Sequence, residues 1–266
     1  MGGNAAQSSR VLVDGVGFDP LTMTQVVDRV AADLANHRGG VIITPNVDIL
    51  RQLRRSQLQN LTDGAAIVVA DGAPVIWASR LRGNPLPERV TGAQLVWTLS
   101  HAAAREGRSV FLLGAGPGVA ERAADQFRRA SPGLKVAGIH SPPWGFEGIQ
   151  GEMEKIDDLL TQEDPDIVFV SIGALRQERL ATRLALAHPG RWFLCCGAAL
   201  DIVAGDVPRA HPAVQRLGVE WVHRLAHEPG RLARRYLIDD LPYASGMLFR
   251  SVLHRARSLS ERTPSW

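Results

Sequence analysis

Short apolar runs alternate with amphipathic stretches of helical length along most of this chain, and this alternation restricts the fold more than any other feature. The runs with the length of buried strands are Val11–Val13, Val41–Thr44, Ile67–Ala70, Val110–Leu113, Val136–Ile139, Ile167–Ser171 and Trp192–Cys196. The stretches typical of helices are Leu21–Asn36, Asp48–Leu58, Ala73–Arg82, Ala93–Arg105, Val119–Ala130, Gly151–Thr161 and Gln177–Ala187. Strands that alternate with helices at this spacing predict βαβ units. The predicted fold is therefore a Rossmann-like α/β core, with a mostly parallel, doubly wound sheet flanked by helices.

The alternation stops near Pro208–Pro212, and the rest of the chain reads as helices interrupted by Pro229-Gly230 and Pro242. We therefore predict a flexible N-terminus (1–9), an α/β catalytic core (10–215) and a helical, Arg-rich C-terminal appendage (216–266). A length of 266 residues with 45% hydrophobic residues suits one α/β domain with such an addition.

Positive charge is concentrated in the predicted appendage. The formal net charge of +3 is too small to predict nucleic-acid binding. Eight arginines, no lysine and four acidic residues lie between Arg216 and Arg257. Arginine favours bidentate contacts with phosphate or carboxylate groups. The arginines near Trp221 and Tyr236 could therefore clamp a diphosphate or attract anionic lipid headgroups, and the alternative is a solvated basic face.

Cellular location is constrained by two further observations. Cys195 and Cys196 are adjacent, so a disulfide between them would be strained, and free thiols in a reducing compartment are expected. The segment Met1 to Arg10 has no basic-then-apolar signal pattern, and no stretch reaches the roughly 20 apolar residues that span a bilayer. The expectation is a soluble or peripheral protein.

Asp71 is the strongest candidate for a catalytic side chain. The run Val68–Ala70 delivers it to Gly72, which places a carboxylate at the carboxyl edge of a parallel sheet, where open α/β folds bind ligands. A carboxylate in that position can act as a general base. An ordinary Asp-Gly turn is the alternative, and the local sequence alone favours it.

Two other strand ends carry candidate binding groups. Thr44 and Asn46 follow one predicted strand and could hydrogen-bond a sugar, although Asn46 would equally serve as a helix N-cap. The turn Gly114-Ala115-Gly116-Pro117-Gly118 could hold a nucleotide phosphate through backbone N–H groups, or be a plain tight turn. It departs from the dinucleotide fingerprint, so the signal for a nicotinamide cofactor is weak.

A metal site is not predicted. Asp164-Pro165-Asp166 resembles the Asp-x-Asp motif of metal-dependent sugar transferases, but it precedes a strand and falls at the wrong edge of the sheet. The histidines are scattered along the sequence. An enzyme that releases a diphosphate without a metal must neutralise its charge in another way, and arginine side chains can do so.

Taken in order, several motifs of this chain resemble the WecG/TagA/CpsF family of bacterial glycosyltransferases over about residues 10–240. The motifs are Thr44-Pro45-Asn46, Ala70-Asp71-Gly72, Pro85-Leu86-Pro87-Glu88-Arg89-Val90-Thr91-Gly92, Phe111-Leu112-Leu113-Gly114, His140-Ser141-Pro142-Pro143-Trp144-Gly145-Phe146, Gln177-Glu178 and Gly218-Val219-Glu220-Trp221. The central Pro-Glu-Arg-Val-Thr-Gly string is the most specific of them.

The resemblance implies inverting transfer of a sugar, often N-acetylmannosamine or its uronic acid, from a UDP donor to a polyprenyl-diphosphate-linked sugar. It implies no metal and no cofactor, action at the cytoplasmic face of the plasma membrane as a peripheral protein, and a product used in surface polysaccharides. The implied site residues are Asp71 as base, Thr44 and Asn46 at the sugar, Gln177 near the donor, and Arg224, Arg231 and Arg234 over the nucleotide diphosphate.

Departures from the family pattern fall near these residues and leave the donor sugar open. Leu175-Arg176 stands where Pro-Lys is common, Val47-Asp48 where Pro-Glu is common, and Leu200 where Phe is usual. Two other functions remain as alternatives: an NAD-dependent oxidoreductase or epimerase of nucleotide sugars, and a non-catalytic nucleotide-sugar-binding scaffold. The acceptor, the polymer and self-association are also open.

Overall fold

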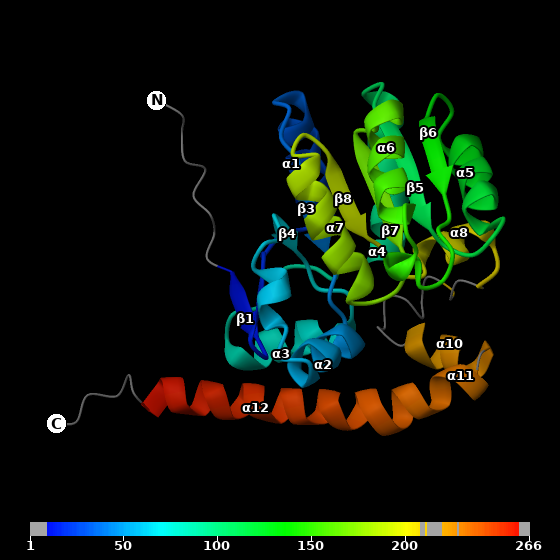
Figure 1. Ribbon diagram of the computed structural model, residues 1–266. Coiled ribbons are helices and arrows are strands. Elements are labelled where there is room, and N and C mark those ends of the chain that lie inside the picture. The colour runs from blue at the N-terminus through cyan, green and yellow to red at the C-terminus, as the bar shows by residue number, and fades with distance from the viewer. Residues whose placement is uncertain (1–9, 208–210, 212–219, 228, 261–266) are drawn as a thin grey trace, which may run out of the picture.

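A six-stranded parallel sheet forms the centre of the computed structural model, which describes residues 10–207, 211, 220–227 and 229–260 (Figure 1). The strand order is β4-β3-β8-β7-β5-β6, and every neighbouring pair is parallel. The strands are β3 (Gly40–Ile43), β4 (Ile67–Val68), β5 (Ser109–Gly114), β6 (Lys135–His140), β7 (Ile167–Ser171) and β8 (Trp192–Cys195). The predicted Rossmann-like α/β fold is confirmed.

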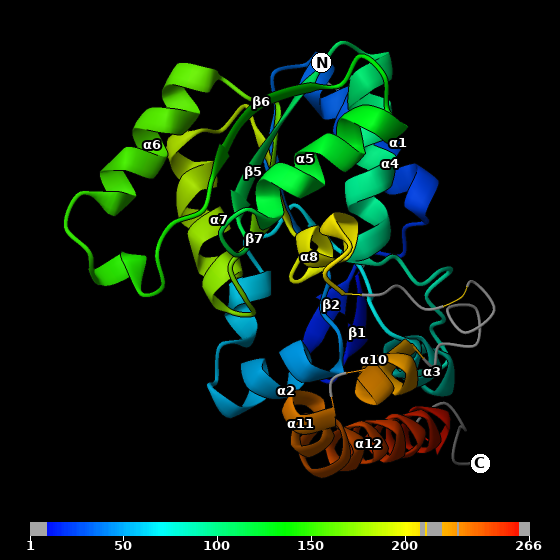
Figure 2. The same ribbon diagram turned by 90° about the vertical axis from the view of Figure 1, so that its right-hand side faces the viewer.

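Helices cover both faces of the sheet, as Figures 1 and 2 show. One core lies beneath α2 (Val47–Arg55), α3 (Ala73–Arg82), α6 (Glu152–Glu163) and α7 (Arg176–Ala187). The other lies beneath α1 (Met23–Ala35), α4 (Gly92–Arg105), α5 (Val119–Ala130) and α8 (Ala199–Ala204). Successive strand residues point to opposite faces, so Ile43 enters the first core and Ile42 the second. This two-sided burial explains why the strands are continuously apolar.

The predicted strand Val11–Val13 does not join the parallel sheet. It forms β1, which pairs antiparallel with β2 (Val16–Phe18) in a separate hairpin. Asp14 and Gly15 form its two-residue turn, with φ angles of 50° and 90°. Asp-Gly is favoured in such turns because both positions require positive φ. The hairpin and the short helices η1 (Gln59–Thr62) and η2 (Phe146–Gly148) complete the core.

The C-terminal appendage is helical, as predicted. It contains α10 (Glu220–His227), α11 (Pro229–Ala233), the π-helical segment η3 (Arg234–Asp240) and α12 (Leu241–Ser260). Pro229 and Pro242 lie in the first turns of α11 and α12, where proline fits. The long helix α12 crosses α3 and α2, below the edge to which the strands point (Figure 1). The predicted flexible segment 1–9 and the start of the appendage lie outside the described residues.

Asp14 joins the hairpin to the appendage. Its side chain is 4% exposed. The carboxylate accepts hydrogen bonds from Arg54 of α2 at 2.9 Å, from Arg250 of α12 at 2.9 and 3.0 Å, and from the hydroxyl of Tyr243. The bidentate Arg250 contact is the stronger kind of charge-assisted pair. One buried carboxylate therefore connects three elements that are distant in the sequence.

Replacing Asp14 with Ala should destabilise the protein and loosen α12. The substitution removes the carboxylate to which Arg54, Tyr243 and Arg250 donate. We expect it to lower the free energy of unfolding by roughly 2–4 kcal/mol. The loss is limited because both arginine side chains are partly exposed and can be hydrated. Thermal unfolding combined with limited proteolysis of the C-terminal region would measure both effects. Asp14→Asn is the matched control, because asparagine tolerates positive φ and keeps a hydrogen-bond acceptor. Equal melting temperatures for wild type and Asp14→Ala would contradict the anchoring role.

Candidate active site

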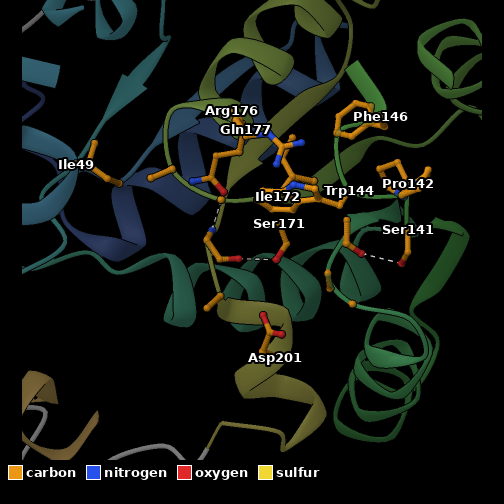
Figure 3. A pocket seen from close by; sticks show the side chains of 18 of the residues that line it. Ile49, Ser141, Pro142, Trp144, Phe146, Ser171, Ile172, Arg176, Gln177 and Asp201 are labelled. Atoms are coloured by element: carbon orange, nitrogen blue, oxygen red, sulfur yellow. Dashed lines mark hydrogen bonds between the residues drawn. The ribbon is translucent and has the colours of Figure 1, made fainter. Parts of the chain in front are cut away.

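A cavity of about 740 Å³ opens at the carboxyl edge of the sheet (Figure 3). Its walls are the turns that follow β3, β5, β6, β7 and β8, together with Arg235 of η3. This is the edge at which doubly wound α/β proteins bind ligands. The cavity is therefore the candidate active site.

Four of the predicted site residues line this cavity: Asn46, Gly114, Gly116 and Gln177. Asn46 is the N-cap of α2, and its side-chain oxygen accepts a hydrogen bond from the backbone N–H of Ile49 at 3.0 Å. The N-cap interpretation is thus confirmed, and it holds this amide at one end of the cavity.

Asp71 and Thr44 lie beside the cavity and are not part of its lining. The backbone N–H of Asp71 donates to the carbonyl of Pro45 at 3.1 Å, so the turns after β4 and β3 are joined. Thr44 is 6% exposed. The predicted grouping of Asp71 with the Thr44–Asn46 turn at one sheet edge is confirmed, whereas their roles toward a substrate stay predictions.

The glycine-rich turn after β5 is tightly packed. Gly114 has a φ of +104°, and a Cβ atom there would lie 2.3 Å from the carbonyl oxygen of Ser171. The N–H of Ala115 donates to that oxygen at 2.7 Å, and the Ser141 hydroxyl donates to the Gly114 carbonyl at 2.9 Å. Only glycine fits at position 114, and the close packing lets backbone form the cavity wall.

Gln177 organises the turn after β8. Its amide nitrogen donates to Glu178 at 2.9 Å, and its amide oxygen accepts from the N–H of Gly197 at 3.0 Å. Burial raises the pKa of Glu178 above its ordinary value. The Ser171 hydroxyl also donates to the Gly197 carbonyl, so the ends of β7 and β8 are fixed together (Figure 3). Gln177 is thus a support for the cavity as well as part of its lining.

An ionic cluster that the sequence did not reveal links the appendage to the cavity. Arg235 of η3 contacts Asp48 of α2 at 2.7 Å. Asp48 also accepts from Arg51 at 2.6 Å, and Arg51 donates to Asp240 at 2.9 Å. Both aspartates are buried. Desolvation raises the pKa of Asp240, and the neighbouring Asp48 adds to the shift. This cluster seats the appendage on α2 and brings a guanidinium to the cavity.

The sequence-predicted arginines of the appendage are only partly described. Arg234 lies in η3 with an exposed side chain, next to Arg235. Arg224 and Arg231 lie on α10 and α11, and their side chains fall outside the described part of the chain. The position of α10 is fixed by an ion pair of 2.7 Å between Arg89 and Glu220.

Three further lining residues were missed as site candidates. Asp201 lies in the first turn of α8, after a predicted strand, so the rule that located Asp71 would also have found it. Trp144 and Arg176 follow β6 and β7 and line the side of the cavity away from Ile49 (Figure 3). Trp144 belongs to the family-like motif 140–146, but an aromatic ring alone does not indicate a catalytic role.

The acidic pair Asp164 and Asp166 lies at the opposite edge of the sheet, as predicted. Asp164 contacts Arg191 at 2.8 Å, and Asp166 accepts from Arg108 and from the N–H of Ser109. Among the residues that the structure describes, no group of three His, Cys, Asp or Glu side chains is placed to hold a metal ion. These two aspartates act as structural acceptors in the amino-end loops.

Comparison with known proteins places this chain in a family. Over 241 residues the chain is 28% identical to an N-acetylglucosaminyldiphosphoundecaprenol N-acetyl-beta-D-mannosaminyltransferase of Staphylococcus aureus (strain MRSA252), covering 90% of this chain and 92% of that protein. A protein of the same name from Bacillus spizizenii is 27% identical over 202 residues, 76% of each chain. The model of the Glycosyl transferase WecG/TagA/CpsF family matches residues 11–258, and the chain belongs to this family of glycosyltransferases.

Proposed function

We propose that this glycosyltransferase moves an N-acetylmannosamine-type sugar from a UDP donor to a polyprenyl-diphosphate-linked saccharide, with inversion at the anomeric carbon. The observation that carries the proposal is the cavity at the carboxyl edge, with the Asp71 turn beside one end and Arg235 of the appendage in its wall. The proposed sugar and the lipid-linked acceptor are those for which the two relatives are named. Family membership favours this reading over an oxidoreductase or a scaffold.

In the proposed mechanism, Asp71 accepts the proton of an acceptor hydroxyl. The freed oxygen attacks the anomeric carbon from the face opposite UDP, the bond to the diphosphate breaks, and UDP leaves. Thr44 and Asn46 hold the transferred sugar. Arg224, Arg231 and Arg234 neutralise the charge that develops on the diphosphate, and no metal or cofactor takes part.

The proposed location is the cytoplasmic face of the plasma membrane, where a polyprenyl-linked acceptor is found. No helix in the described part of the chain is long and apolar enough to cross a bilayer. Helix α12 carries exposed apolar side chains, among them Leu241, Phe249 and Val252, which suit binding parallel to a membrane surface. No nucleic-acid partner is proposed.

Release of UDP from a panel of UDP-sugars tests this function. Wild-type protein should release UDP from UDP-N-acetylmannosamine only when a polyprenyl-diphosphate-linked N-acetylglucosamine is present. The rate should be the same with excess chelator, because arginine takes the place of a metal. Release without acceptor, or a chelator-sensitive rate that magnesium restores, would contradict the proposed reaction.

A further inference from the structure

An exposed tryptophan forms one wall of the cavity without a packing reason for its exposure. Trp144 lies in the turn after β6 and is 89% exposed. Neighbouring Phe146, by contrast, is 1% exposed and belongs to the core. A large aromatic side chain left in solvent at the wall of a ligand cavity has surface available for contact with a ligand.

The indole is held by Arg176, at the start of α7. The guanidinium carbon of Arg176 lies 4.5 Å from the centre of the Trp144 ring and 5.6 Å from that of Phe146. Two nitrogens of Arg176 donate to the two carboxylate oxygens of Glu147, each at 2.7 Å. These hydrogen bonds lower the pKa of Glu147 below its ordinary value. Figure 3 shows Trp144, Arg176 and Phe146 gathered on the same side of the cavity.

The position of Trp144 in the sheet identifies what it can contact. Asn46 follows β3 and Trp144 follows β6, and the strand order places four strand intervals between them. At about 4.8 Å per interval the span is roughly 19 Å. The turns after β8, β7 and β5 lie between the two, and each contributes glycine to the cavity wall (Gly197, Gly173, Gly114 and Gly116). Glycine lets backbone N–H groups approach a phosphate closely.

This arrangement gives a bound nucleotide sugar a direction along the carboxyl edge of the sheet, from the β3 end to the β6 end. With the sugar beside the Asp71 and Asn46 turns, the diphosphate lies over the glycine-containing turns and the base reaches the β6 end. With α12 at the membrane surface, as proposed above, the lipid-linked acceptor approaches from the other end, because α12 packs on α2 and α3, the helices that follow β3 and β4. Trp144 is therefore at the base end of the donor, at the opposite end of the cavity edge from the Asn46 turn.

We propose that Trp144, held in place by Arg176 and Glu147, is the stacking platform for the pyrimidine base of the donor nucleotide. The proposal rests on the proposed function, because it assumes a UDP donor. Trp144 contacts the ligand directly, while Arg176 is a positioning residue that acts through the indole. Lysine at position 176 would keep the charge but lose both the planar stack and the fork to Glu147.

Calorimetric binding of UDP, UMP and inorganic pyrophosphate to the full chain tests the platform. A base stacked on an aromatic ring typically gains roughly ten- to hundredfold in affinity. Trp144→Ala should weaken UDP and UMP binding by at least about tenfold, Trp144→Phe should retain most of the affinity, and pyrophosphate should bind equally to all three proteins. Trp77→Ala, which removes a partly exposed tryptophan on α3 outside the cavity, is the matched control. Thermal unfolding verifies that each variant is folded.

Steady-state kinetics separate the platform from other roles of these residues. Trp144→Ala and Arg176→Lys should raise KM for the UDP-sugar while kcat and the KM of the acceptor stay near wild type. Unchanged UDP affinity in Trp144→Ala would overturn the proposal, and so would a rise confined to the acceptor KM. If folded wild-type protein transfers no sugar from a UDP-sugar, the proposed function itself fails. If transfer is intact and insensitive to Trp144→Ala, only the platform is refuted.

Discussion

Replacing Asp71 with Asn should lower kcat for sugar transfer about 10²–10⁴-fold, the usual contribution of a general base. The acceptor hydroxyl would then have to lose its proton without a positioned carboxylate. Asparagine has the same shape and keeps the backbone hydrogen bond from residue 71 to Pro45, so the turn should survive. Affinity for UDP should therefore be unchanged. Rates of UDP release at saturating substrates, with calorimetry for UDP binding, measure the two quantities separately.

A matched control for this variant is Asp63→Asn, at an exposed position in the loop before β4. It makes the same chemical change near the same strand and should leave kcat unaltered. A loss of less than about tenfold in Asp71→Asn would remove the base assignment. Equal losses of kcat and of UDP affinity would indicate a disturbed turn and would likewise count against a specific proton-transfer role.

A parallel sheet could be predicted from the sequence, but the order of its strands could not. The bounds of several helices and strands, by contrast, could be predicted closely. Ile167–Ser171, Ala73–Arg82 and Val119–Ala130 begin and end in the structure where the sequence places them. Burial on both faces makes such strands continuously apolar, which is a strong local signal. The strand Val11–Val13 was predicted, but its partner Val16–Phe18 was missed because it is short and includes a glycine, so the β1–β2 hairpin was not recognised. Its stability comes from packing and from the Asp14 contacts, which no local pattern reveals.

The same distinction applies to the site. Asp71 could be located from sequence because the polarity of a parallel sheet places every strand end at one edge. The cluster of Arg51, Asp48, Arg235 and Asp240 could not, because Arg51 and Asp240 are 189 positions apart. Four charges that nearly neutralise one another in space look like ordinary surface charges in the sequence. Arg235 was thus grouped with a solvated or phosphate-binding face, while the structure pairs it with Asp48.

Helix α12 and η3 present a second apolar surface that points away from the core. The buried side chains Ala244, Met247 and Ser251 recur at helical spacing on the face that packs on the core. A different face carries the exposed side chains of Ile238, Leu241, Phe249, Val252 and Leu259, between 48% and 67% exposed. Their spacing of 3, 8, 3 and 7 residues keeps them near one side of the helix. We call these five residues the α12 stripe.

Changing two residues of the α12 stripe to glutamate (Ile238→Glu with Phe249→Glu) should detach the protein from anionic vesicles. Burying a large apolar side chain contributes about 1.5–3 kcal/mol, so losing two and adding negative charge should weaken vesicle binding at least about a hundredfold. Flotation with vesicles that contain anionic lipid and the polyprenyl acceptor measures binding. UDP release with the same vesicles should fall in parallel, whereas release with a water-soluble, short-chain acceptor should stay at the wild-type rate.

Leu186→Glu provides the comparison that makes this result specific. Leu186 is 83% exposed and lies near the end of α7, on the part of the molecule away from α12 (Figure 1). If general loss of surface hydrophobicity weakened vesicle binding, this variant would show it as well. If only the α12 stripe matters, Leu186→Glu binds vesicles like wild type, and the helix that packs on α2 and α3 is also the surface that meets the lipid. The acceptor would then enter beside Asp71. Full vesicle binding by the double variant would instead place the membrane contact on another face of the protein.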